Sequence, residues 1–284
     1  MHSGDPAPSK PSAAGVPGLP LPLSGRTELY GIIGDPIAQA GSPIVFNTAF
    51  RNAGMQAVLV PLHVSAAGLM PFVTGAKRIG NLRGLIITKP HKTAIVACVN
   101  EICPNARRSR SVNAIRCAPD GIWVGDNFDG VGCITGLLAA RHDLRGRRVL
   151  IIGTGGAGRA VAFAAANAGV AGLGLFDINE QEVLHVSREL KRSNSSIPCQ
   201  TGSSDPSGFD VIINCTHLGM VHSDPLPIDP AKLRPGSLVV DLVVEPEMTP
   251  LLRAAVERSC SIHTGKNTLS GQVGAVLAFF QEGK

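Results

Sequence analysis

A glycine-rich run, Gly153-Thr154-Gly155-Gly156-Ala157-Gly158, follows the apolar residues Val149–Ile152 and precedes an alanine-rich stretch. A G-x-G-x-x-G spacing between a strand and a helix is typical of loops that bind the pyrophosphate of a dinucleotide. Gly153 permits the tight turn, Gly155 lets the backbone approach the phosphates, and Gly158 lets the helix lie against the sheet. Gly156 and Ala157 stand at the helix N-terminus, where free N–H groups favour an anion. The alternative is a glycine-rich turn that binds nothing.

A carboxylate follows at a spacing suited to a ribose. Asp177 comes directly after the apolar run Leu173–Phe176, 24 residues beyond Gly153, near the ~20-residue spacing of the acid that binds ribose hydroxyls in such folds. A carboxylate there accepts hydrogen bonds from the hydroxyls and repels a 2′-phosphate. We therefore expect NAD as the cofactor, with NADP as the alternative. The other interpretation of Asp177 is an N-cap for the next helix.

Further blocks of polar residues occur in a fixed order along the chain. Lys92 closes the run Thr88-Lys89-Pro90-His91-Lys92, and Asp129 lies in Gly125-Asp126-Asn127-Phe128-Asp129-Gly130. The other blocks are Gly34–Ala38 with Ser42-Pro43, Ser111–Ala114, Asn214–Thr216 with Gly219-Met220, and Thr249–Leu252 with Gly265–Gln272. Together they resemble the shikimate/quinate dehydrogenase family, from about residue 29 to the C-terminus.

The resemblance implies that Lys92 is the acid/base group and that Asp129 is its partner. Oxidation of an alcohol releases a hydride and a proton, so a base must reach the hydroxyl within ~3 Å. The cofactor takes the hydride, and the protein positions both reactants. A lysine taken alone is more often a solvated surface charge, and the surrounding block is what singles out Lys92.

The resemblance also implies a set of binding residues. On the substrate side, Asn113 and Gln272 would bind ring hydroxyls, Thr88 would line the pocket, and Ser42 with Gln39 would hold the carboxylate. On the cofactor side, the residues added to the glycine-rich loop and Asp177 are Thr216, Gly219, Met220 and Gly265. We expect no metal.

Three positions depart from the family pattern, which usually has Ser, Asn and Tyr where this chain has Ala40, Ile86 and Val244. Each change removes a polar group from the surroundings of the substrate's acid group. A carboxylate left without a partner costs several kcal/mol, roughly 2–7 for a polar group. The predicted function is therefore reversible hydride transfer at a ring hydroxyl of shikimate or a close analogue. The alternatives are a quinate dehydrogenase and a nucleotide-binding regulator without turnover.

The pattern of apolar runs predicts an α/β protein with two domains. An N-terminal α/β substrate-binding domain would span 27–130 and be completed by the C-terminal helix, 268–284. Strict alternation of strands and Ala/Gly-rich helices predicts a Rossmann domain, a doubly wound parallel sheet, over 131–267. Six prolines among Ser, Ala and Gly predict a disordered tail over 1–26.

Local signals predict the elements that carry the blocks. Ser42 and Pro43 suit the N-cap and first position of a helix reaching about Ala53. Helices are also expected over 66–79, 92–103, 131–140 and 270–280, with 125–130 as a loop.

Composition narrows the partners. The net charge is only +5 and no run of five basic residues occurs, so we expect no nucleic acid partner. No apolar stretch reaches 18 residues, which argues against a membrane span. Seven cysteines form no C-x-x-C pair, as expected for a protein of the reducing cytoplasm. The predicted partner is a small cyclic hydroxy acid bound by a monomer or a homodimer.

Overall fold

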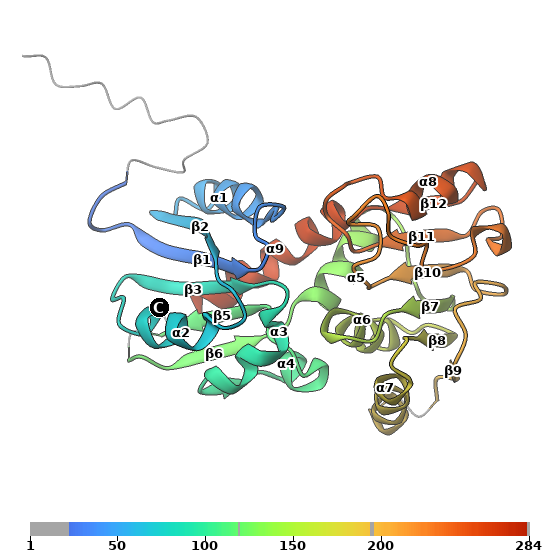
Figure 1. Cartoon of the computed structure of the whole chain (residues 1–284), viewed down its shortest axis with the longest axis horizontal. Helices are drawn as coiled ribbons and strands as arrows, with labels where there is room; N and C mark the ends of the chain where they lie inside the picture. Colours follow the sequence, from blue (N-terminus) through green and yellow to red (C-terminus); the bar gives the residue numbers. More distant parts are fainter. Residues whose placement is uncertain (1–22, 119, 194–195, 283–284) are drawn as a thin grey trace, which may run out of the picture.

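The computed structural model describes residues 23–118, 120–193 and 196–282. It has two lobes, each built on a six-stranded sheet (Figure 1). The tail expected over 1–26 lies outside the described residues except for 23–26. The α/β fold class is confirmed.

The N-terminal sheet has the strand order β2-β1-β3-β5-β6-β4. Its first three strands are parallel, β5 is antiparallel to β3 and β6, and the short β4 pairs parallel with β6. Alternation along β1 sends Tyr30 and Ile32 to one apolar cluster and Ile33 to the other, so both faces are covered. The strands are β1 (Glu28–Gly34), β2 (Ala57–His63), β3 (Leu82–Ile87), β4 (Glu101–Ile102), β5 (Ala114–Cys117) and β6 (Trp123–Asp126).

Two helices of this lobe differ from the sequence prediction at their starts. Helix α1 (Ser42–Asn52) has Gly41 as its N-cap, so Ser42 is its first residue and makes no capping bond. Helix α2 (Leu69–Ala76) is shorter than expected because residues 65–68 form a turn, in which Gly68 N donates to Ser65 O at 3.0 Å.

The helix expected over 92–103 is wrong beyond Cys98. It comprises α3 (His91–Ala94) and the 3-10 helix η1 (Ile95–Cys98), after which the chain is extended and forms β4. The backbone N–H groups of Asn100 and Cys103 donate to the carbonyls of Trp123 and Gly125. Pairing with β6 thus overrides the helical pattern, and the following helix α4 (Pro104–Ser109) was not predicted.

The C-terminal sheet is entirely parallel, with the order β12-β11-β10-β7-β8-β9. Numbered from β7, this is the 3-2-1-4-5-6 order of the dinucleotide-binding doubly wound fold. The predicted Rossmann topology is therefore confirmed. The strands are β7 (Arg148–Ile152), β8 (Gly172–Phe176), β9 (Cys199–Thr201), β10 (Val211–Asn214), β11 (Leu238–Asp241) and β12 (Ser261–His263).

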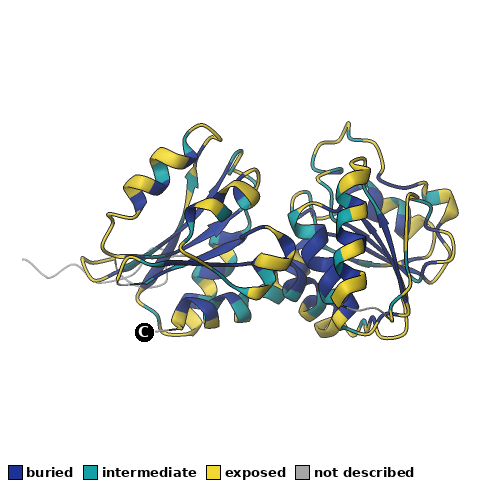
Figure 2. Ribbon diagram, turned by 90° about the horizontal axis from the view of Figure 1, so that it is seen from below, coloured by how far each residue is buried: buried dark blue, intermediate teal, exposed yellow. Residues whose placement is uncertain are grey.

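Helices cover both faces of this sheet and bury an apolar cluster on each (Figure 2). They are α6 (Gly156–Asn167), α7 (Glu180–Ser193) and α8 (Pro250–Glu257), with the 3-10 helix η2 (Pro230–Lys232) before β11. In Figure 2 the buried residues follow the strands and the inward helix faces of both lobes.

Two helices join the lobes, and both begin earlier than predicted. Helix α5 (Asp129–Ala139) starts at Asp129 rather than in a loop, and α9 (Gly265–Gln281) runs from the C-terminal lobe into the N-terminal lobe (Figure 1). There Phe279 and Phe280, each at most 3% exposed, join the cluster around Tyr30. Helix α9 thus completes the core of the first lobe.

Candidate active site

Lys92 and Asp129 form an ion pair where the two lobes meet. Lys92, on α3, places its Nζ 2.6 Å from Oδ2 of Asp129, the first residue of α5. The two side chains are 24% and 12% exposed, so solvent reaches the pair but does not surround it. A carboxylate in the first turn of a helix is also stabilised by the helix dipole.

Asn113 and Gln272 complete a hydrogen-bonded network with this pair. Asn113 Nδ2 donates to Asp129 Oδ1 at 2.9 Å and to Gln272 Oε1 at 3.1 Å. Asn113 Oδ1 accepts from the N–H of Phe128, which fixes the direction of the amide. Residues from four separate segments, that of Asp129 included, therefore form one hydrogen-bonded network.

Asn127 and Ser111 support Asp129 from behind. Asn127 Oδ1 accepts from the N–H of Asp129 at 3.0 Å, and its Nδ2 donates to Ser111 Oγ at 2.9 Å. Sequence reasoning left Asn127 out of the site, although its block pointed to it. The structure gives it a positioning role, because its side chain is 1% exposed and fully engaged.

The residues predicted to hold the substrate's carboxylate are not part of this network. Ser42 is 7% exposed, and its hydroxyl has no hydrogen-bond partner within the described chain. Gln39 Nε2 donates to the carbonyl of Pro36 in its own loop at 2.9 Å. Thr88 follows β3 and is half-buried, and its methyl group occupies the space beside Gly34.

The three departures from the family pattern lie in apolar surroundings. Ile86 is 8% exposed and belongs to the same apolar cluster against which Ala40 packs. A Cβ at Gly41 would lie 3.2 Å from a methyl carbon of Val244, which places Val244 beside the Ala40 loop. The side chains at these three positions are themselves apolar, whereas the family pattern has Ser, Asn and Tyr there.

The glycine-rich loop has the shape that phosphate binding requires. Gly153 has φ +91°, and Gly155 is the extended N-cap of α6, with no atom within 4 Å of where its Cβ would be. At Gly158 a Cβ would collide with the carbonyl of Gly153. Gly156 and Ala157 open the helix, so their N–H groups are available to an anion. The loop therefore fits a pyrophosphate.

Asp177 lies between this loop and α7. Its Oδ2 accepts from the N–H of Thr154 at 2.7 Å, and its Oδ1 accepts from the N–H of Asn179. The N-cap alternative for Asp177 is wrong, because Asn179 Oδ1 accepts from the N–H of Glu182 in the first turn of α7. A carboxylate has about four acceptor positions, so Asp177 keeps capacity for a ribose hydroxyl.

The nearby cation, Arg159 on α6, is already paired. Its NH2 group donates to Glu182 Oε2, while Nε and NH1 have no partner within the described chain. Arg159 is 3% exposed, and burial lowers the pKa of its guanidinium. Two carboxylates, those of Asp177 and Glu182, therefore lie near the N-termini of α6 and α7. Arg159 is the nearby cation, and it is paired with Glu182. Sequence reasoning did not find this pair.

The loop after β10 is the predicted nicotinamide-side segment. The N–H and hydroxyl of Thr216 both donate to Asn214 Oδ1, and Gly219 turns the chain with φ +102°. Met220 Sδ lies 3.1 Å from Lys89 Nζ, so this loop contacts the N-terminal lobe. Gly265 begins α9 against the carbonyl of Val243, too close for any side chain.

A buried acid holds this loop from below. Asp241 is fully buried and accepts hydrogen bonds from Asn214 Nδ2, the N–H of Val243 and Thr249 Oγ1. Burial raises the pKa of Asp241 to about 6 despite those donors. The acid that anchors the loop therefore has a pKa of about 6, above its ordinary value of 3.8.

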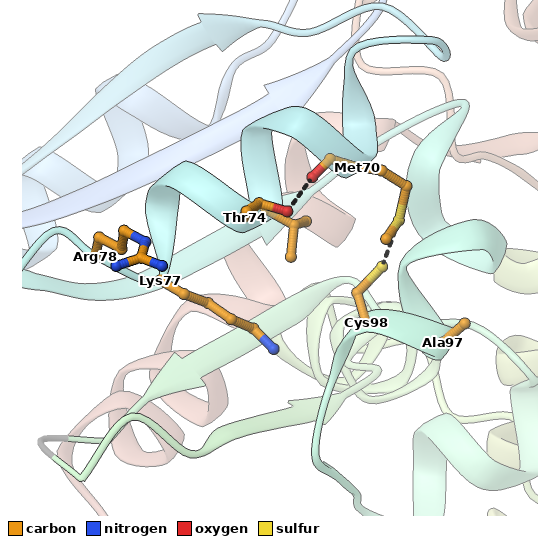
Figure 3. Close-up of a pocket in the computed structure, with 7 residues that line it drawn as sticks. Met70, Thr74, Lys77, Arg78, Ala97 and Cys98 are labelled. Carbon is orange, nitrogen blue, oxygen red and sulfur yellow. Dashed lines mark hydrogen bonds between the residues drawn. The ribbon is translucent and has the colours of Figure 1, made fainter.

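Apart from the candidate active site, a pocket of about 560 Å³ lies on the N-terminal lobe between α2 and η1 (Figure 3). Lys77 and Arg78 stand at one end of it, and the sulfur atoms of Met70 and Cys98 meet at the other, 3.5 Å apart. No predicted site residue lines it.

Two further classes of site were sought in the described residues. Across 23–118, 120–193 and 196–282, no helix has both the length and the apolar character to cross a membrane. Over the same ranges, no group of His, Cys, Asp or Glu is arranged to hold a metal ion.

A Rossmann lobe joined to a second α/β lobe that presents a lysine–aspartate pair is the architecture of a nicotinamide-dependent oxidoreductase. Residues 32–115 match the family model of the shikimate dehydrogenase substrate binding domain. The chain is 34% identical over 248 residues to shikimate dehydrogenase (NADP(+)) of Rubrobacter xylanophilus, covering 86% of this chain and 87% of the relative. This chain belongs to the shikimate dehydrogenase family.

Solved structures agree with the sequence relatives. A shikimate dehydrogenase in complex with NADP+ superposes with a TM-score of 0.84 at 28% identity, covering 94% of this chain and 93% of that one. The 5-ketofructose reductase of a Gluconobacter species reaches 0.77 at 27% identity, covering 91% and 94%. The same fold therefore occurs in proteins named for different substrates.

Replacing Asp241 by Asn should change how stability depends on pH. The pKa of Asp241 is raised from 3.8 to about 6 on folding. Its contribution to the free energy of unfolding is therefore fully present below about pH 4 and is lost as the pH rises through about 6. As the pH rises from 4 to 7, the free energy of unfolding of Asp241→Asn should therefore increase relative to that of the native protein by on the order of 2–3 kcal/mol. Urea unfolding at pH 4.5, 5.5 and 7 measures this difference.

The exposed Asp143→Asn is the matched control and should show no such pH-dependent gain. A constant difference between Asp241→Asn and the native protein across this range would contradict the raised pKa.

Proposed function

We propose that this protein is an oxidoreductase that transfers a hydride between a nicotinamide cofactor and a ring hydroxyl of shikimate or a close analogue. The N-terminal lobe, with the end of α9, would bind the substrate, and the C-terminal lobe would bind the cofactor. The observation that carries the proposal is the 2.6 Å pair of Lys92 and Asp129 within the Asn113–Gln272 network. The names of the relatives support the same reaction.

The chemistry follows from this chain's own groups. In the oxidation, Lys92 Nζ, as the neutral amine, accepts the proton of the substrate hydroxyl, and in the reduction the ammonium form of Lys92 donates that proton to the carbonyl oxygen. Asp129 holds the lysine in place, because its Oδ2 accepts a hydrogen bond from Lys92 Nζ at 2.6 Å. Asn113 and Gln272 present amide groups to neighbouring hydroxyls by exchanging their mutual bond for bonds to the substrate. The glycine-rich loop and Asp177 would hold a nicotinamide cofactor, which would supply the acceptor or donor of the hydride.

For the cofactor we propose NAD ahead of NADP, although the relative from Rubrobacter xylanophilus is named for NADP(+). Asp177, directly after β8, can still accept further hydrogen bonds, and Glu182 accepts a hydrogen bond from the guanidinium of Arg159. A 2′-phosphate placed between α6 and α7 would therefore meet two carboxylates and a cation already paired. Like charges a few Å apart cost about 1–4 kcal/mol near a protein surface.

For the substrate, the apolar surroundings of Ala40, Ile86 and Val244 favour a weakly held acid group. Quinate is one alternative to shikimate. A neutral polyhydroxy ketone is a second alternative, because the similar Gluconobacter enzyme is named for 5-ketofructose, a sugar without a carboxylate. A regulator without turnover has less support, since it has no physical need of the four-residue network.

Replacing Lys92 by Ala should reduce turnover by about 10²–10⁴-fold, the range for an acid/base group. Nucleotide binding should persist, because Lys92 belongs to the opposite lobe. The measurement is kcat on the best substrate of a panel of cyclic hydroxy acids and keto sugars, with nucleotide affinity by titration. Lys77→Ala, at the C-cap of α2 in the same lobe, is the control and should retain native turnover. Near-native turnover of Lys92→Ala would refute the assignment.

Replacing Asp177 by Asn should raise KM for NAD and narrow the preference for NAD over NADP by about tenfold, equivalent to ~1.4 kcal/mol. The variant loses the charge but keeps an acceptor for Thr154. The measurement is kcat/KM with each nucleotide. Glu180→Gln, which removes an exposed acid from the first turn of α7, should leave the ratio unchanged. A native protein that prefers NADP would overturn the cofactor proposal.

Replacing Ala40 by Ser should lower KM for shikimate by about 10–150-fold, the effect of one hydrogen bond to a charged group. The native KM for shikimate should accordingly be high. Both are measured at saturating nucleotide, and Ala38→Ser, exposed in the same loop, is the control. If the native KM is low and Ala40→Ser raises it, the pocket holds the acid by other groups.

A further inference from the structure

A groove of about 330 Å³ runs between α4 of the N-terminal lobe and helices α5 and α6. Its apolar walls come from Val131 and Ile134 on α5 and from Ala160, Phe163 and Ala164 on α6. Arg108 of α4 lines it from the other lobe. We call it the α4–α5–α6 groove. Its volume lies in the range of sites for small ligands, and a molecule bound here would touch both lobes.

The charge of the groove is one-sided. None of its lining residues is acidic, and Arg108 is the cation among them. Arg108 is exposed and forms no ion pair with any acid in the described chain. Asn105 and Asn127 line the same space. An apolar trough with a guanidinium on its rim suits a compact apolar body that carries one carboxylate, because the guanidinium pairs with it through two parallel bonds.

The groove lies directly behind the lysine–aspartate pair. Asn127 lines the groove, and its Oδ1 accepts a hydrogen bond from the N–H of Asp129 at 3.0 Å. Gly130, which follows Asp129 in the chain, also lines the groove. A Cβ at Gly130 would lie 2.3 Å from the carbonyl of Ala160, so α5 and α6 touch at this point. A molecule seated here thus contacts the residues on both sides of Asp129, whose carboxylate holds Lys92.

We propose that the α4–α5–α6 groove is an effector site for a small organic monoanion with an apolar ring. Its carboxylate pairs with Arg108 and its ring packs on Ile134 and Phe163. Occupancy presses on Asn127 and Gly130 and displaces Asp129 from its place beside Lys92. The ligand therefore lowers kcat without competing with the substrate or the nucleotide. The rate effect rests on the proposed function, whereas binding does not.

The test uses the full chain and 3-phenylpropionate as the probe, with the neutral 3-phenylpropanamide as its matched ligand. Calorimetric titration should show that 3-phenylpropionate binds the native protein, and that saturating shikimate and NAD do not displace it. Arg108→Gln should weaken binding by about tenfold or more, as for the loss of a charged hydrogen bond. Arg107→Gln, the neighbouring arginine that does not line the groove, should bind as the native protein does. The amide should bind as weakly to the native protein as the acid binds to Arg108→Gln.

A second arm measures the rate. Saturating 3-phenylpropionate should lower kcat by about fivefold or more, the lower end of allosteric coupling, with KM unchanged and the effect lost in Arg108→Gln. No binding, equal binding to Arg108→Gln, or displacement by substrate or nucleotide would overturn the site. Binding with an unchanged kcat would overturn the effector role. If the protein turns over no substrate but the titrations behave as expected, the proposed function fails and the binding site stands.

Discussion

The arrangement of the whole molecule depends on the close crossing of α5 and α9. A Cβ at Gly271 would lie 2.3 Å from the carbonyl of Gly132, and one at Gly136 would lie 2.7 Å from the carbonyl of Asn267. Only glycines permit backbones to approach this closely. The crossing fixes α9 along its path into the N-terminal lobe and fixes the start of α5. It therefore determines where Gln272 and Asp129 lie, and with them the centre of the candidate site.

Given that crossing, the site is built by directional hydrogen bonds around one carboxylate. Both oxygens of Asp129 receive donors, from Lys92 and from Asn113, and its N–H is accepted by Asn127. Each of those partners comes from a different segment and is held by another bond, such as that of Asn113 Oδ1 to the N–H of Phe128. The cofactor side depends instead on backbone shape, since Gly153 and Gly158 let the loop and helix close around the phosphate position. On the substrate side, a polar network fixes the positions of the side chains. On the cofactor side, glycines without side chains leave room for the phosphates.

Sequence reasoning succeeded where the signal was local. The glycine-rich loop, the alternation that predicts the parallel sheet and the polar blocks all act within a few residues, and the fold class followed from them. It failed where distant segments decide, as at β4, where pairing with β6 ended a helical pattern. Asp129 was placed in a loop because nothing local shows that α5 begins there. Arg159 and Glu182 lie on two different helices and are 23 residues apart in the sequence, so no local signal indicated their pairing. The roles of the individual site residues stay predictions until turnover is measured.

The path of α9 also sets the order in which the two lobes become complete during synthesis. The Rossmann sheet is contiguous in the sequence, from β7 to β12. Strand β1 precedes the Rossmann sheet in the chain, yet Phe279 and Phe280, which cover Tyr30 and its neighbours, follow Tyr30 by roughly 250 residues. At 5–20 residues per second, roughly 12–50 s separate the emergence of Tyr30 from that of Phe280. For that interval the apolar face around Tyr30 lacks the cover that α9 provides, and exposed apolar surface of this kind is prone to aggregation.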